Sequence, residues 1–265
     1  MPVFNSNPNS QAVIKDLVKI ATGLNAGQVD LLIEIAESMA RPVTAVVDPA
    51  TDIVVPTFAS NFCTRLLIHH ATTAEKFKKK SFEYAFAAAS QASGRTATLT
   101  VSGTFSGADV IVDGVKFSCK TEASAKISET RITISKLMEA RWIRECHTGR
   151  DFLQGVQSKV VPHLRGYERI LILRAIDRAA GAIEYRLVEM PLQVLQAIGR
   201  LNAEDFGPRT DNGGSSAKVR YKGDVAFTLR LDGSVEKVTV AGLSTDFCRT
   251  HASWLIPVRQ DDDEN

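Results

Sequence analysis

The chain lacks any long run of apolar residues, and no stretch approaches the ~20 residues that a membrane-spanning helix needs. Its N-terminus has no charged region followed by an apolar stretch, so we expect no secretory signal. The sequence contains no Walker A loop and no GxGxxG, GxSxG or HExxH motif. These absences argue against a membrane protein and against the enzyme classes that those motifs mark.

Cysteine is scarce and scattered. The four cysteines form no CxxC pair and no Cys/His cluster with zinc spacing, and they are Cys63, Cys119, Cys146 and Cys248. Widely spaced cysteines of this kind are typical of reduced, mostly buried thiols. The sequence therefore predicts a cytoplasmic protein without a zinc site. The adjacent His69 and His70, which also lack further ligands, are interpreted as helix-entry or core residues.

Charge is nearly balanced over the whole chain, with 32 Lys+Arg against 30 Asp+Glu and a net charge of +2. Residues 261–264 are four consecutive acids, a pattern typical of a solvated, disordered tail. Without them, 32 positive side chains face 26 negative ones, a net +6. Residues 120–169 alone carry ten positive and six acidic side chains. The balance therefore conceals a basic body that suits a nucleic-acid partner.

Hydrophobic residues at 44% and charged residues at 23% are ordinary globular values, which excludes wholesale disorder. Apolar spacing predicts two helices within residues 10–40, and a Thr72-x-x-Glu75 capping box predicts a helix that runs to Gly94. Further helices are predicted over 133–146 and 191–201, and residues 42–62 are expected to be irregular to extended. Strands are predicted over 95–105, 108–112, 115–121, 170–176, 183–188, 218–221, 225–231 and 235–240.

These elements predict an α+β fold with an α/β-like core, in which a mixed central β-sheet is flanked by helices. We expect one domain over residues 1–260, followed by the acidic tail, 261–265. Within the domain we distinguish a helical N-terminal part, a core and a C-terminal β unit, over residues 10–60, 72–190 and 215–258.

The segment from Gly107 to Lys120 carries the most informative residues. Asp113-Gly114 is a strong signal for a two-residue hairpin turn, because both positions tolerate positive φ. The pairing that such a turn imposes sets Asp109 opposite Ser118 and makes Lys120 a diagonal neighbour. Side chains 118 and 120 share a face, since strands have a period of two. An acid, a hydroxyl and a lysine are therefore expected to converge on one edge of the hairpin.

An acid on one strand, a short turn and x-x-Lys on the next strand resembles the hallmark of the PD-(D/E)xK nuclease superfamily, which includes most type II restriction endonucleases. Asp109 matches the first acid and Lys120 the lysine, while Ala108 replaces the usual Pro. Ser118 stands where the second acid is normally found, so the motif is similar to a Ser-x-Lys variant. The resemblance covers roughly residues 72–145 and implies a restriction-endonuclease-like fold.

In that variant the missing carboxylate comes from the following helix, but the matching positions here are Thr133 and Ile134. The resemblance also places a glutamate on the preceding helix, and Glu83 matches that position. Three other acids stay open as alternatives, namely Glu122, Glu129 and Glu139.

The chemistry of phosphodiester hydrolysis suits these residues. The reaction needs a hard cation, usually Mg²⁺, to neutralise charge on the phosphate and to lower the pKa of the attacking water. Two converging carboxylates make a competent site for that cation, and a lysine beside them stabilises negative charge or accepts a proton. The resemblance thus implies Mg²⁺ held by Asp109 and Glu83, with Lys120 and Ser118 completing the catalytic site.

The implied substrate is double-stranded DNA, and the implied assembly is a homodimer that cuts both strands of a palindrome. Residues 10–40 are the most apolar candidate for the dimer interface, with a core role as an equal alternative. The polar connection over 121–131 and the basic segment after it are candidates for DNA contact. The DNA-binding candidates are Ser124, Lys126, Arg131, Lys136, Arg141 and Arg144.

Other interpretations are compatible with the same residues. Asp109 and Lys120 form a structural ion pair if the chain is a non-catalytic nucleic-acid-binding or assembly protein. Glu83 lies four residues after Lys79, so a surface ion pair also explains it. A repair or recombination nuclease of the same superfamily is a further alternative.

Overall fold

The computed structural model describes residues 9–100 and 107–258. The acidic tail and part of the strand predicted over 95–105 therefore lie outside the described residues. The main helices are α1 (Asn9–Ala21), α2 (Ala26–Ala40), α3 (Pro56–Thr72), α4 (Lys79–Ala92), α5 (Gly149–Gly155), α6 (Val161–Leu164) and α7 (Leu192–Gln196), with a π-helical turn (Val156–Val160) joining α5 to α6. Short 3₁₀ segments are Arg141–Glu145, Ala179–Gly181, Ala197–Arg200, Ala203–Asp205 and Thr245–Phe247.

The strands belong to two sheets. They are β1 (Thr44–Val47), β2 (Ala97–Leu99), β3 (Val110–Val112), β4 (Val115–Glu122), β5 (Arg131–Glu139), β6 (Arg169–Arg178), β7 (Ala182–Met190), β8 (Ser215–Tyr221), β9 (Asp224–Asp232), β10 (Lys237–Ser244) and β11 (Arg249–Pro257). The main sheet has seven strands in the order β1-β11-β7-β6-β4-β3-β2, and within it only β4 and β6 run parallel. The second sheet has the order β5-β10-β9-β8.

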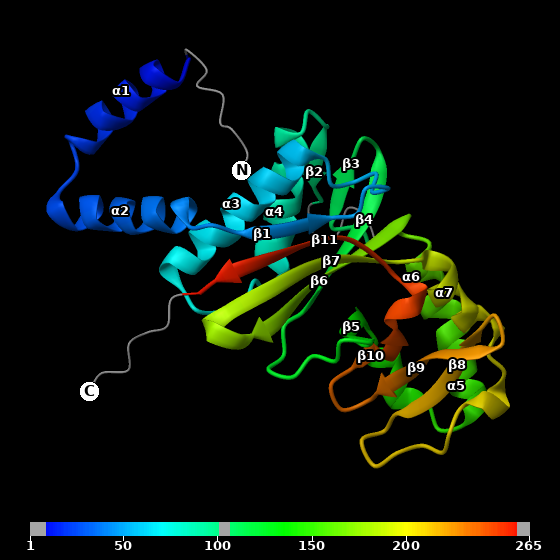
Figure 1. Cartoon of the computed structure of the whole chain (residues 1–265). Coiled ribbons are helices and arrows are strands. Elements are labelled where there is room, and N and C mark those ends of the chain that lie inside the picture. The colour runs from blue at the N-terminus through cyan, green and yellow to red at the C-terminus, as the bar shows by residue number, and fades with distance from the viewer. Residues whose placement is uncertain (1–8, 101–106, 259–265) are drawn as a thin grey trace, which may run out of the picture.

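The main sheet is the middle layer of the molecule. Helices α3 and α4 cover one of its faces, and α5 to α7 with the second sheet lie on the other side (Figure 1). Strand β6 has the alternation that this position requires, because Leu171 and Leu173 belong to the core under α3 and α4 while Ile170 and Ile172 belong to the opposite core. The predicted α+β fold with a mixed sheet flanked by helices is confirmed.

The prediction of a helix over residues 133–146 is wrong. The segment forms strand β5 and then a short 3₁₀ turn. Its register with β10 pairs Val238 with Met138 and Val240 with Ile134, so β5 holds two extra residues between these pairs. Ile134, Leu137 and Met138 lie three and four residues apart in the sequence, which imitates the period of a helix. The bulge lets a strand accommodate that spacing.

The helix boundaries in the first third of the chain also differ from the prediction. Thr72 ends α3 instead of starting the next helix, and its hydroxyl donates to the carbonyl of His69. Helix α4 begins only at Lys79. The segment over 42–62, predicted as irregular to extended, turns into α3 at Pro56, whose fixed φ suits the first position of a helix.

The C-terminal strands divide between the two sheets. Strands β8, β9 and β10 form the predicted antiparallel unit, whereas β11 returns to the main sheet between β1 and β7. Trp254 of β11 is fully buried and packs on Phe62 of α3. Asp232 pairs with Lys237, so residues 233–236 form a four-residue loop between β9 and β10.

No helix in the described ranges is both long and apolar enough to cross a bilayer. All four cysteines are free, and Cys119 and Cys146 are buried. His70 is buried as well, in agreement with the core role predicted for it.

Candidate active site

The hairpin formed by β3 and β4 has the predicted geometry. Asp113 and Gly114 adopt φ of 49° and 83°, as the turn requires. Val110 pairs with Phe117 and Val112 with Val115. The two-residue turn therefore fixes the register that brings Asp109 next to Ser118.

Asp109 follows the loop that leads into β3, and both of its carboxylate oxygens have partners. Oδ2 accepts a hydrogen bond from the backbone N–H of Cys119 at 2.7 Å and one from the Ser118 hydroxyl at 3.3 Å. Oδ1 lies 2.6 Å from Nζ of Lys79. Strand β4 thus holds one oxygen of Asp109, and the other oxygen faces helix α4.

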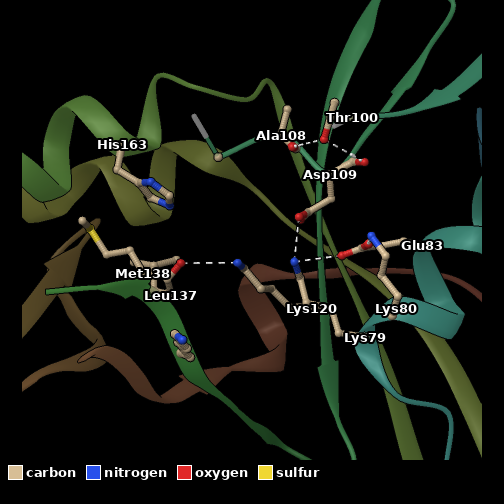
Figure 2. A pocket seen from close by; sticks show the side chains of 12 residues that line it. Lys79, Lys80, Glu83, Thr100, Ala108, Asp109, Lys120, Leu137, Met138 and His163 are labelled. Atoms are coloured by element: carbon tan, nitrogen blue, oxygen red, sulfur yellow. Dashed lines mark hydrogen bonds and ion pairs between the residues drawn. The ribbon is translucent and has the colours of Figure 1, made fainter. Parts of the chain in front are cut away.

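Glu83 projects from α4 toward the same point, and its side chain is only 6% exposed. Its Oε1 lies 2.8 Å from Nζ of Lys79, and its Oε2 lies 3.0 Å from Nζ of Lys80. The ammonium of Lys79 therefore lies between the carboxylates of Glu83 and Asp109 (Figure 2). Burial alone lowers the pKa of Lys79, but the hydrogen bonds that its ammonium donates to Asp109 and Glu83 outweigh burial and raise that pKa above its ordinary value.

Lys120 extends from β4 toward β5, and its Nζ donates to the carbonyl of Leu137 at 3.3 Å (Figure 2). Burial lowers the pKa of Lys120 below its ordinary value, and the positive charge of Lys79 acts in the same direction against the opposing charge of Asp109. The ion partner of Asp109 is Lys79, which replaces the structural Asp109–Lys120 pair considered from the sequence.

These side chains line one cavity of about 570 Å³ between α4, the hairpin, β5 and α6. The bulge in β5 contributes Lys136, Leu137 and Met138 to the wall opposite Asp109. The complete lining is Lys79, Lys80, Glu83, Thr100, Gly107, Ala108, Asp109, Lys120, Lys136, Leu137, Met138 and His163. Four lysines and two carboxylates give this cavity a positive balance that suits a phosphate.

The three alternative acids lie elsewhere. Glu122 is buried against Arg174, 2.6 Å from its Nε, and also accepts from the backbone N–H of Thr133. Glu129 pairs with two arginines, Arg178 and Arg186. Glu139 is exposed and pairs with Lys136 on β5. None of these acids lines the cavity, so among the open alternatives the structure brings only Glu83 to Asp109.

The predicted DNA-binding residues are more dispersed. Lys136 lines the cavity, while Arg141 and Arg144 both contact Glu236 beside the second sheet. The last two arginines were assigned to a helix, and the structure places them on a 3₁₀ turn instead. Arg131 donates to the carbonyl of Gly242, and the Ser124 hydroxyl to that of Lys126. Of the six candidates, Lys136 lines the cavity and the other five do not.

Sequence reasoning missed Lys79 and His163 as site residues. The Lys79–Glu83 spacing of four was read only as a surface ion pair, because the sequence does not reveal that Asp109 lies on the other side of the ammonium. His163 reaches the cavity from α6, and its buried Nε2 has no hydrogen-bond partner among the residues that the structure describes. Burial and the charge of Lys120 lower the pKa of His163.

The chain is similar to known proteins over most of its length. A family model described as SmaI, type II site-specific deoxyribonuclease, matches residues 17–256. The chain is 31% identical over 209 residues to the type II restriction enzyme SmaI of Serratia marcescens, covering 77% of this chain and 81% of that protein. No solved structure matches the chain.

Proposed function

Because the chain belongs to the SmaI family of type II site-specific deoxyribonucleases, we propose that it hydrolyses double-stranded DNA with Mg²⁺ held by Asp109 and Glu83. The observation that carries this proposal is the position of the Lys79 ammonium, 2.6 Å from one carboxylate and 2.8 Å from the other. Because the two carboxylates share one cation, an oxygen of each lies beside a single position of the size of a cation. Oxygen ligands of this kind are what Mg²⁺ prefers.

When bound, Mg²⁺ supplies charge neutralisation at the phosphate and a lowered pKa for the attacking water. The residues of the chain supply the geometry. Oδ2 of Asp109 is held by the Cys119 amide and the Ser118 hydroxyl, so the other oxygen, Oδ1, keeps a fixed direction. Ser118 therefore acts by orienting Asp109, and Glu83 takes the place of the acid that position 118 lacks.

Lys120 is the candidate for proton transfer. Its depressed pKa increases the fraction of neutral amine, which accepts a proton as the water oxygen bonds to phosphorus and the bridging P–O bond breaks. As an ammonium, the same group stabilises the negative charge that develops on the phosphate oxygens. The carbonyl of Leu137 orients Nζ for either role.

Cleavage of plasmid DNA with and without Mg²⁺ tests the assignment. Asp109→Ala and Lys120→Ala are each expected to lower the rate by roughly 10³-fold, since each removes a group that acts in the transition state. Glu139→Ala, which changes an exposed acid outside the cavity, serves as the control and keeps the wild-type rate. Discrete fragments support a restriction enzyme, whereas a smear supports a repair or recombination nuclease.

A cleavage rate that Asp109→Ala leaves unchanged contradicts the assigned site. Cleavage that persists in excess chelator contradicts the proposed requirement for a metal ion.

We further propose that the protein acts as a homodimer in the cytoplasm, with α1 and α2 at the interface. Five apolar side chains of α1 are at least half exposed, namely Val13, Ile14, Leu17, Val18 and Ile20. An isolated helix of 13 residues is marginal in water, so this face needs a partner. Helix α1 carries two lysines and one aspartate, a net +1, and α2 carries three acids and no basic residue. This complementarity suits a second copy in which α1 of each protomer packs against α2 of the other.

A further inference from the structure

Lys79 bridges the two carboxylates that the proposed function assigns to the metal. Its Nζ lies 2.6 Å from Asp109 and 2.8 Å from Glu83, while its side chain is 43% exposed. Lys80, the other lysine that contacts Glu83, is 68% exposed, and among the described residues it makes no ion pair with Asp109. Among the described residues, Lys79 is thus the cation that the two carboxylates share.

Two carboxylates converging at one point repel each other unless a positive charge lies between them. Glu83 is almost buried, so water gives it little relief. The Lys79 ammonium supplies the missing charge, and its hydrogen bonds hold both carboxylates in place. In the free protein, the Lys79 ammonium therefore neutralises and positions the two carboxylates, as a bound metal cation would.

A Mg²⁺ ion binds carboxylate oxygens at ~2.1 Å and cannot share this position with an ammonium. On the basis of the proposed function, we propose that Lys79 is a positioning residue that occupies the metal position in the free enzyme and has to leave it when the metal binds. Its exposed, flexible chain allows that movement. The phosphate backbone of bound DNA offers the displaced ammonium a new partner, so DNA and metal assist each other's binding.

Isothermal titration of the full-length protein with Mn²⁺, in the absence of DNA, tests this inference. Lys79→Met keeps the length of the side chain but removes the competing charge, so Mn²⁺ should bind about tenfold more tightly than to the wild type. Lys80→Met is the matched control, and its effect on the Mn²⁺ affinity should be severalfold smaller than that of Lys79→Met. An unchanged or weaker affinity in Lys79→Met overturns the inference.

Thermal unfolding supplies a second readout. In excess chelator Lys79→Met should unfold at a lower temperature than the wild type, because the two carboxylates lose their shared cation, and saturating Mn²⁺ should narrow the gap. If the Met variant does not fold, Lys79→Gln is titrated instead with the same expected direction. A gap that Mn²⁺ leaves unchanged contradicts the inference.

The Mn²⁺ affinity of Asp109→Asn distinguishes a failure of the proposed function from a failure of this inference. If Asp109→Asn binds Mn²⁺ as tightly as the wild type, the metal site lies elsewhere and both proposals fall. If Asp109→Asn loses Mn²⁺ binding but Lys79→Met gains none, only the role of Lys79 is wrong. A short uncleavable duplex should also increase the Mn²⁺ affinity more in the wild type than in Lys79→Met.

Discussion

At the scale of single residues, the site depends on how Asp109 is held. The Asp113-Gly114 turn made its neighbourhood predictable, because turn geometry alone fixes the pairing of β3 with β4. The partner of its other oxygen, Oδ1, was not predictable. Lys79 lies 30 residues earlier in the chain, and only the packing of α4 on the hairpin brings the two together.

Removing the Ser118 hydroxyl should weaken the site without abolishing it. Ser118→Ala deletes one of the two hydrogen bonds to Oδ2 of Asp109 and leaves the one from Cys119. The loss of one such bond, worth about 1 kcal/mol, predicts a cleavage rate about fivefold lower. Ser215→Ala, which changes another buried serine in the second sheet, is the control and should keep the wild-type rate. An equal loss in both variants would indicate a general effect on folding.

The depressed pKa of Lys120 predicts a pH dependence of cleavage. If the neutral amine accepts the proton, kcat/KM should rise with pH and level off at an apparent pKa below 10.5, the ordinary value for lysine. The measurement is the pH profile of cleavage of a short duplex. Lys120→Arg, whose guanidinium stays protonated, should lose both the rising limb and most of the activity. A profile that is the same in both proteins would contradict this role.

At the scale of elements, the segment between α3 and α4 is anchored by a buried hydrogen-bonded chain. The N–H of Phe77 donates to the Tyr185 hydroxyl at 3.0 Å, and that hydroxyl lies 2.8 Å from Nε2 of His70. Nδ1 of His70 lies 3.0 Å from the carbonyl of Thr73. A neutral ring that accepts at Nε2 and donates at Nδ1 satisfies every contact. This chain fixes the start of α4, and hence Lys79 and Glu83.

Protonation of His70 should therefore destabilise the fold. Burial lowers its pKa from 6.5 to about 4. Between these values the unfolded chain binds the proton and the folded chain does not, so stability is present above pH 6.5 and is lost as the pH falls toward 4. Urea midpoints at several pH values should fall over this window in the wild type and fall less in His70→Gln. Parallel pH profiles in the two proteins would contradict the assignment.

Strand β5 shows why some elements escaped prediction. Residues 135–137 have no partner in the register of β5 with β10, so this part of the strand is a bulge. Leu137 and Met138 follow Ile134 by three and four residues, a spacing that is typical of a helix. The same irregularity serves the site, since the bulged residues line the cavity and offer the Leu137 carbonyl to Lys120. A sequence pattern that follows a regular period cannot reveal a bulge created by the neighbouring strand.

At the scale of the whole molecule, the layers were easier to predict than the connections. The continuous apolar run of β6 and the alternating apolar residues of β7 indicate a buried sheet wherever they lie in the chain. The return of β11 to that sheet depends on contacts with α3, far away in sequence, and no local pattern carries them. The dispersal of the predicted DNA-binding residues has the same origin.

The exposed apolar face of α1 gives a prediction at this scale. Leu17→Glu places a charge in the proposed interface and should convert the dimer to a monomer, which light scattering after size-exclusion chromatography measures directly. Val235→Glu, at a similarly exposed residue on the loop between β9 and β10, is the control and should stay dimeric. A wild-type protein that is monomeric at all concentrations would contradict the interface.

The central claim is that Asp109 and Glu83 hold one catalytic metal. The most direct test is a crystal structure of the wild-type protein with Mn²⁺ and a DNA duplex, in which anomalous scattering locates the ion. We expect a peak ~2.2 Å from an oxygen of each carboxylate, with the Lys79 ammonium moved away from the space between them. An ion bound elsewhere, with Lys79 still bridging Asp109 and Glu83, would contradict it.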